Sequence, residues 1–356
     1  MAEELKVIRE MTLEAIRTQS REPSSVFRNR VRYVNYGGCY YFAPMTARQF
    51  KRVCADEACA FFNSSFHNPA EFTVVLVGAL DTKTAIPLIE QYLGTLPEQS
   101  EPAPKKRASL TPLPFSFPTR VVDEEVRVAM VEPNNATQIT FPVQLTSDDR
   151  VGCHAEVHWV ALATRLLESR LLNLLRFKYG EVYSVSVSAF FGAEGPGNKQ
   201  SLRGDVAIYF TCDPEAAQRL RGLALDELSR LQEEGPSAED VATAVELETR
   251  AYEVAKQENS HWAECISNAY QSRFFDDDVD AAYNTSVRCR SEVMATATPE
   301  AMRAVLRRVF PYPCRSRYTA LTLLPQRPWY RRPVPLSLTV AVAAATVYGV
   351  VHWRRR

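Results

Sequence analysis

The chain has 356 residues and a mass of 40.2 kDa, which is enough for about two ordinary domains. Apolar residues make up 46% of it and charged residues 24%, and 42 basic residues balance 42 acidic ones. This zero formal charge argues against a nucleic-acid-binding protein held by bulk charge. The apolar content also argues against low-complexity disorder.

The eight cysteines are scattered and form no Cys-x-x-Cys pair, which excludes a zinc knuckle. A chain of this length can bury a core without disulfides, so we expect mostly reduced thiols. Only five histidines are present, and this limits the metal sites that histidine could build.

Residues 1–97 predict a partial αβ unit. Residues 2–20 form a charged amphipathic helical pattern, and Thr46 can cap a second helix over about 47–66. The β-branched run Phe72–Val77 has the length and composition of a strand, and Asp81 precedes a helix over 82–94. Residues 98–119 contain five prolines, so we expect a linker there.

Residues 120–325 predict one complete α+β unit. Paired strands precede and follow a long helix, several helices come next, and a single strand closes the unit. The expected strands are 126–131, 138–145, 182–190, 201–211 and 318–324, and the expected helices are 151–178, 214–234, 237 to beyond 256, 261–273 and 299–309. Strand pairs joined like hairpins favour an antiparallel sheet covered by helices on one face.

Residues 334–353 carry no charged side chain over about the length of a bilayer, and arginines flank both ends. Trp329, Tyr330 and Trp353 stand where interfacial aromatics would stand. We therefore expect a single-pass C-terminal transmembrane helix, with a loose apolar tail as the alternative. Two basic flanks leave its orientation open.

Several long stretches resemble the pitrilysin/insulinase family of zinc metallopeptidases. They are FHNPAEFTVVLVGALDTKTAIPLIEQYLGTLP (66–97), LESRLLNLLRFKYGEVYSVSV (167–187), LSRLQEEGPSAEDV (228–241), QENSHWAECISNAYQSR (257–273) and TPEAMRAVLRRVFPYPCRSRYTALTLLP (298–325). The resemblance is closest to the PqqL-like zinc proteases, including plant-type forms with a C-terminal membrane span, and it covers nearly everything up to residue 325.

The resemblance implies four similar αβ domains in two halves that close around an unfolded peptide. Residues 1–97 would be the C-terminal part of the third domain and 120–325 the complete fourth. The family binds zinc in its first domain through a His-x-x-Glu-His motif, and this chain contains no such motif. The resemblance therefore places the zinc outside this chain, which itself would bind no metal or cofactor.

The string from His154 to His158 is the nearest approach to a zinc motif. The two histidines share a helix face, but Glu156 lies roughly 200° around the helix, so it cannot act as a base beside a metal. Two packing or solvated histidines are the alternative, and they fit this spacing better.

Arg176 and Tyr183 match a family pair, seven residues apart, that reaches across the closed cavity. The resemblance implies that they hold the substrate carbonyl and stabilise the oxyanion. In the alternative, Arg176 only offsets the negative end of its helix and Tyr183 is a half-buried strand residue.

By this resemblance the chain is the substrate-chamber half of a zinc metalloendopeptidase, inactive alone. Its expected partners are an unfolded peptide, a zinc-bearing N-terminal half or catalytic subunit, and a membrane, with a mitochondrion or plastid as possible organelles. Two alternatives stay open. One is a non-catalytic scaffold subunit of a membrane or processing-peptidase complex, and the other is a fragment without a stable fold.

Overall fold

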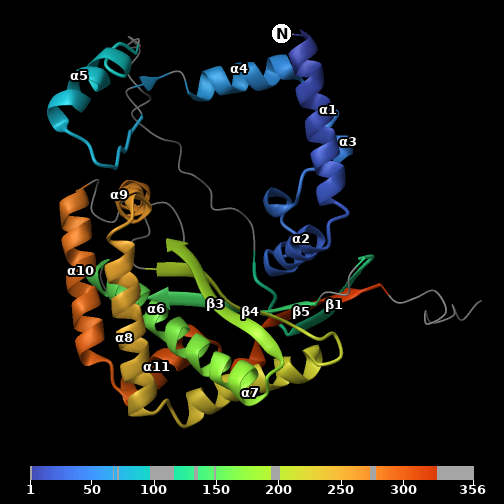
Figure 1. Cartoon of the computed structure of the whole chain (residues 1–356), viewed down its shortest axis with the longest axis vertical. Helices are drawn as coiled ribbons and strands as arrows, with labels where there is room; N and C mark the ends of the chain where they lie inside the picture. Colours follow the sequence, from blue (N-terminus) through green and yellow to red (C-terminus); the bar gives the residue numbers. More distant parts are fainter. Residues whose placement is uncertain are drawn as a thin grey trace, which may run out of the picture.

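The computed structural model describes residues 2–66, 68–69, 72–96, 116–131, 135–147, 150–193, 201–272 and 278–326. A five-stranded sheet lies at the centre of the second part of the chain, with strands in the order β1-β5-β2-β4-β3 (Figure 1). The strands are β1 (Val122–Val128), β2 (Ala136–Thr146), β3 (Val182–Ala193), β4 (Ser201–Cys212) and β5 (Thr319–Pro325). The expected α+β class is confirmed.

Pairing in the sheet joins the two ends of this unit. β3 and β4 form the expected antiparallel hairpin, and β4 pairs with β2. The expectation that β1 and β2 also form a hairpin is wrong, because β5 inserts between them. β5 pairs with β2 antiparallel and with β1 parallel. The strand that pairs with β1 lies almost 200 residues further along the chain, so local turn signals could not predict this pairing.

Helices α6 (Arg150–Leu172), α7 (Ala217–Glu233) and α11 (Pro299–Val309) cover one face of the sheet, as expected. Helices α8 (Ala238–Ala255) and α10 (Val279–Thr296) pack against α6, and α9 (Asn259–Ser272) packs against α10. Alternate strand residues, such as Ile139, Phe141, Val206 and Ile208, point into one core with apolar residues of α6, α7 and α11. Within it Phe141 meets Phe310 edge to face, with ring centroids 5.3 Å apart.

A further helix, α2 (Pro23–Asn35), packs on the opposite face at the β1–β5 end of the sheet. Phe27, Val31 and Val34 are buried there against Leu321 and Leu323. The Thr319 hydroxyl donates to Asn35 Oδ1 at 2.6 Å, and Arg30 forms two hydrogen bonds with Glu124 at 2.5 and 2.8 Å. Apolar contacts and polar bonds together anchor this helix to the sheet.

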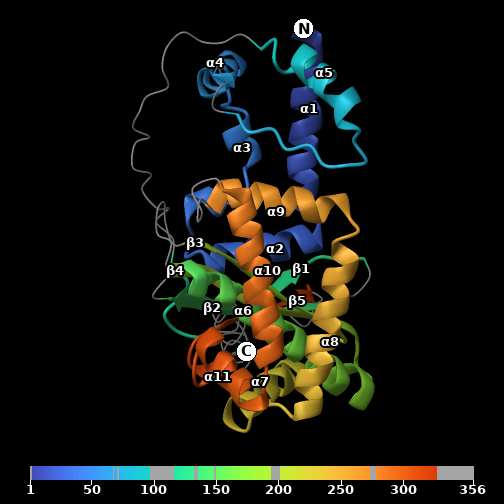
Figure 2. The same ribbon diagram turned by 90° about the vertical axis from the view of Figure 1, so that its left-hand side faces the viewer.

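The remaining N-terminal helices lie beyond α2, away from the covered face of the sheet (Figures 1 and 2). They are α1 (Ala2–Gln19), α3 (Ala47–Phe50), α4 (Ala55–Ser65) and α5 (Thr82–Tyr92). The expected helix over 47–66 is interrupted between α3 and α4, at residues 51–54. Phe72–Val77 forms no strand, so that expectation is wrong: no described strand lies beside it to share a ladder. The linker 98–119 lies outside the described residues up to position 115.

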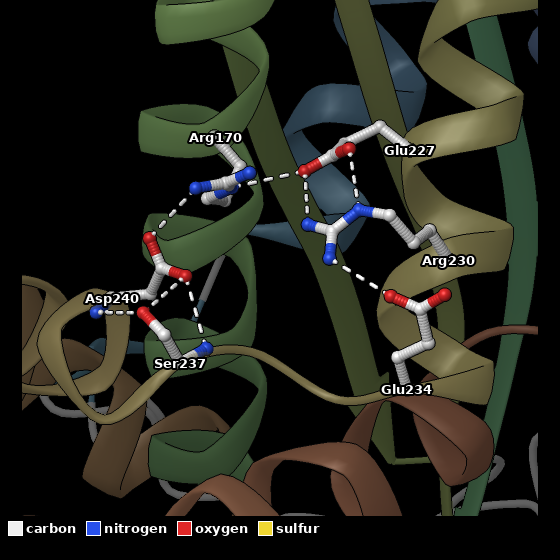
Figure 3. A network of polar contacts seen from close by, with 6 residues as sticks. All are labelled: Arg170, Glu227, Arg230, Glu234, Ser237 and Asp240. Atoms are coloured by element: carbon white, nitrogen blue, oxygen red, sulfur yellow. Dashed lines mark hydrogen bonds and ion pairs between the residues drawn. The ribbon is translucent and has the colours of Figure 1, made fainter.

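A network of charged side chains joins α6, α7 and α8 on the helical side (Figure 3). Arg170 contacts both Glu227, at 2.9 Å, and Asp240, at 3.0 Å. Arg230 binds the same Glu227 carboxylate at 2.8 Å and reaches Glu234 at its other side. Because Glu227 accepts from two arginines of different helices, it holds α6 against α7.

The expected membrane localisation is corrected. Within the part of the chain that the structure describes, no helix is both long and apolar enough to cross a membrane. The segment 334–353, on which that expectation rested, lies outside the described residues.

Candidate substrate-contact site

Arg176 lies where the long helix α6 ends and the chain turns back towards the sheet. After α6 the backbone continues through a π-helical segment, Asn173–Lys178. The carbonyl of Arg176 accepts the Gly180 amide at 2.9 Å, and Gly180 takes a φ of 69°, in the left-handed region that suits glycine. This turn delivers the chain directly into β3.

Tyr183 lies near the start of β3, which is an edge strand of the sheet. The pairing of β3 with β4 is irregular between Val182 and Val185, and both of these valines point into the core. Tyr183 lies between them, and its side chain is 80% exposed. The alternative of a half-buried strand tyrosine is therefore wrong.

The structure brings the two predicted site residues together. The Arg176 guanidinium carbon lies 5.3 Å from the centroid of the Tyr183 ring and 5.5 Å from that of Phe177. Such exposed cation–π contacts contribute about 0.5–1 kcal/mol each, enough to favour this placement of the guanidinium without fixing it. Among the described residues Arg176 forms no ion pair, so its N–H groups and the Tyr183 hydroxyl remain available as donors.

A second group of cations and rings, which the sequence analysis missed, adjoins this pair. Lys178 lies 5.6 Å from the ring of Tyr179, and Arg219 of α7 lies at the same distance from that ring. Arg219 also pairs with Glu181. The alternation of basic and aromatic residues over 176–179 was the available signal, and it indicates a surface suited to carbonyl and carboxylate groups.

The outer edge of β3 is partly occupied by a side chain of α6. Glu168 accepts the backbone N–H of Val187 through Oε2 at 2.9 Å. This amide points away from β4, so it would otherwise be an unpaired donor at the sheet edge. Glu168 thus closes one position at which another strand could add to β3.

The residues of the string 154–158 do not converge on a common point. His158 meets Ser286 of α10 at 3.2 Å, whereas Glu156 forms an ion pair with Arg308 of α11 at 2.9 Å. Burial lowers the pKa of His154, and burial together with the nearby Arg290 lowers that of His158 to about 4. In the described part of the chain no three His, Cys, Asp or Glu residues could hold a metal ion. These residues do not fit a zinc site.

Known sequences resemble most of the chain. The family described as "Peptidase M16 inactive domain" matches residues 53–247. A curated relative from Arabidopsis thaliana, "Zinc protease PQQL-like", is 41% identical over 326 residues, which are 91% of this chain and 34% of the relative. The chain therefore spans about a third of the length of that relative.

Solved structures share the fold at low sequence identity. The periplasmic protease PqqL from Escherichia coli matches with a TM-score of 0.61 and 18% identity, over 90% of this chain and 32% of the other. A peptidase M16 inactive domain from Pseudomonas fluorescens matches with a TM-score of 0.62 and 16% identity, over 92% and 73%. A protease from Helicobacter pylori gives a TM-score of 0.67 at 12% identity, over 91% and 73%. With more than half of its residues matched by the family, the chain belongs to the peptidase M16 inactive domains.

Proposed function

We propose that this chain forms the substrate-chamber half of a zinc metalloendopeptidase and supplies Arg176 and Tyr183 to the substrate carbonyl. The zinc and its ligands then lie in an N-terminal half or catalytic subunit that this chain does not contain. The observation that carries the proposal is the contact between Arg176 and Tyr183 at the edge strand β3, where the guanidinium carbon lies 5.3 Å from the centroid of the exposed tyrosine ring. Membership of the M16 inactive domains, and the likeness to a PQQL-like protease, support it.

The chemistry expected of the pair follows from its donors. The guanidinium offers a planar fork of N–H groups, and the phenol offers one O–H. Both can donate to one carbonyl oxygen of a bound peptide, and both bonds strengthen as negative charge develops on that oxygen during cleavage. Their position on a strand and a helix end, and not on a long loop, keeps them pre-positioned for this task.

A chimera tests this role. Residues 2–326 of this chain replace the matching part of the Arabidopsis relative, and kcat and KM are measured on an unfolded peptide. We expect Tyr183→Phe to lower kcat about 10²–10³-fold, since it removes one donor to the oxyanion. Arg176→Ala should be at least as damaging, and Arg176→Lys should recover only part of the loss because it lacks the fork.

Two exposed residues outside α6 and β3 provide matched controls. Tyr312 hydrogen-bonds Glu233, and Arg250 pairs with Glu246 on α8. Tyr312→Phe and Arg250→Ala should leave kcat unchanged. An unchanged kcat in both Tyr183→Phe and Arg176→Ala would refute the role of the pair. Chelator-sensitive cleavage by the chain alone would refute the placement of the zinc outside it.

A scaffold subunit without catalytic chemistry is the second candidate. The apolar surface of α4 and α5 favours it, since neither helix buries a residue and every large apolar side chain on them is exposed. Such a subunit needs no Arg–Tyr pair, so the kinetic effect of Tyr183→Phe separates the two functions. Co-purification of the chain with a zinc-bearing half would support the first, and with a membrane complex the second.

A further inference from the structure

One carboxylate of the central sheet takes no part in the site described above. Asp205 lies in the middle of β4, an interior strand between β2 and β3. Val206 and Ile208 of the same strand point into the core under the helices. Because side chains alternate along a strand, Asp205 points to the opposite face of the sheet, the face on which α2 packs.

Aromatic rings lie on two sides of Asp205 on this face. In the sheet register Asp205 is opposite Pro142 of β2 and Phe190 of β3, and the Phe190 side chain is 74% exposed. On the other side α2 ends at Tyr36, whose ring stacks on that of Phe42 with centroids 4.0 Å apart. Burial, and after it the nearby Asp205 carboxylate, raises the pKa of Tyr36. The carboxylate therefore lies between an exposed ring and an aromatic pair.

The charge of Asp205 has no counter-charge within the described part of the chain. No arginine or lysine there forms an ion pair with it, although Arg203 is two positions along the same face and Arg32 lies near Tyr36. Burial raises the pKa of Asp205 to about 6. Carboxylates withdrawn from water are normally paired with a cation or a hydrogen-bond donor. Asp205 has the surroundings of a cation site for which the described residues supply no cation.

Such a carboxylate weakens the fold at neutral pH. Its folded pKa lies above the ordinary value, so the folded state favours the protonated form. The stability that this group contributes is complete at low pH and is lost as the pH rises through about 6. Asp205→Asn should therefore leave Tm unchanged or raise it at pH 7. Groups that reduce stability in this way are concentrated at binding and catalytic sites.

We propose that Asp205 binds a basic side chain of the unfolded peptide substrate, with the exposed ring of Phe190 as the surface along which that side chain lies. An arginine fits best, because its guanidinium can donate two parallel hydrogen bonds to the carboxylate while its stem packs on the ring. A lysine offers the charge without the fork. This inference rests on the proposed substrate-chamber role and makes Asp205 a specificity-determining residue for it.

The sheet sets the distance between this subsite and the Arg176–Tyr183 pair. Tyr183 and Phe190 are seven residues apart on β3, which corresponds to roughly 20 Å along a strand. An extended peptide covers this distance with about six or seven residues. The selected basic residue should lie that far from the cleaved bond, remote from the chemistry. Contacts of this kind strengthen substrate and transition-state binding alike, so they act on KM and not on kcat.

A peptide series tests the subsite in the chimera described above. Each unfolded peptide carries one arginine, moved position by position away from the cleaved bond, and the reference peptide carries glutamine instead. We expect kcat/KM to be about tenfold higher when the arginine is about six or seven residues away. Asp205→Asn should reduce this peptide to the level of the reference by raising KM at unchanged kcat. Asp205→Glu should keep part of the preference.

The pH dependence and a matched control add independent readouts. The preference for arginine should decline as the pH falls below about 6, because Asp205 becomes protonated. The phenol of Tyr36 and the guanidinium groups of Arg32 and Arg203 keep their charge state in this range. Glu258→Gln removes an exposed carboxylate at the end of α8 and should change neither KM nor Tm.

The outcomes separate this inference from the proposed function. An arginine preference that survives Asp205→Asn, or equal kcat/KM for all peptides, would refute the subsite. So would a lower Tm of Asp205→Asn, since it would show that the carboxylate is paired within the protein. Loss of the preference in Asp205→Asn, in a chimera whose kcat ignores Tyr183→Phe, would support this inference and refute the role of the pair.

Binding replaces kinetics if the chimera is inactive. Fluorescence anisotropy then compares labelled arginine and glutamine peptides on the full chain. We expect the arginine peptide to bind about tenfold more tightly, and Asp205→Asn to abolish the difference. Equal binding of the two peptides by the wild-type chain would refute the subsite.

Discussion

Replacing Glu227 with glutamine tests the charged network that joins α6 to α7. The carboxylate is only 8% exposed and accepts hydrogen bonds from Arg170 at 2.9 Å and from Arg230 at 2.8 Å. Breaking a fully buried ion pair costs about 3–5 kcal/mol. Here the arginine side chains are 31% and 37% exposed, and each keeps a second partner, Asp240 or Glu234. We therefore expect a loss of about 2 kcal/mol at pH 7.

The assay is thermal unfolding of the full chain, followed by circular dichroism, at several pH values. A loss of this size lowers Tm by about 4–8 °C in a unit of this length. Burial alone would raise the pKa of Glu227, but the hydrogen bonds from Arg230 and Arg170 outweigh it and hold the pKa below its ordinary value. Its contribution is thus complete above the unfolded pKa of about 4.5 and disappears as the pH falls through the lower folded value.

The difference between the wild-type chain and Glu227→Gln should accordingly shrink on acidification below about pH 4.5. Glu234→Gln is the matched control, since its side chain is 69% exposed at the end of the same network, and it should cost less than about 0.5 kcal/mol. Equal stability of Glu227→Gln and the wild type at pH 7 would refute the argument. So would a difference that grows on acidification.

Three further outcomes are expected. Phe141→Ala removes a fully buried ring that meets Phe310 and should cost about 3–5 kcal/mol in urea unfolding; a cost below 1 kcal/mol would contradict the packing. Thr319→Val leaves the buried side-chain oxygen of Asn35 without its hydrogen-bond donor, which should lower the free energy of unfolding by about 1–3 kcal/mol. The amides of α2 should then exchange faster. Unchanged exchange would show that this hydrogen bond does not anchor α2. His158, neutral in the fold with a pKa of about 4, contributes stability above pH 6.5 that is lost as the pH falls towards 4, by about 3 kcal/mol at most. NMR titration of the ring checks this value, and a midpoint near 6.5 would refute it.

The elements that the sequence predicted well are those whose signals are local. The hairpin of β3 and β4 and the start of α8 just after Ser237 each depend on residues close in sequence. The pair of Arg176 and Tyr183 came from the family resemblance, and the turn at Gly180 between them brings the two side chains into contact. Residue spacing over a short stretch of sequence is enough to predict elements of this kind.

The elements that were missed depend on distant partners or on weak patterns. The sequence analysis did not predict α2, whose sequence contains several arginines. Phe27, Val31 and Val34 nevertheless recur at helical spacing and form its buried face. α10 carries mostly small and polar residues, and it is held by its packing against α6, which no local pattern reveals. The position of β5 between β1 and β2 likewise depends on the tertiary fold alone.

The bond between Glu168 and the Val187 amide also bears on how copies of this chain behave at high concentration. Before two molecules could pair through their β3 edges, each would have to displace the Glu168 carboxylate from its Val187 amide. The pairing would also bring the two carboxylates close to each other, which is unfavourable. We therefore expect a high protein concentration alone not to cause fibril formation through the β3 edge. Replacing Glu168 with an apolar side chain should allow this pairing, and light scattering would detect the resulting aggregates.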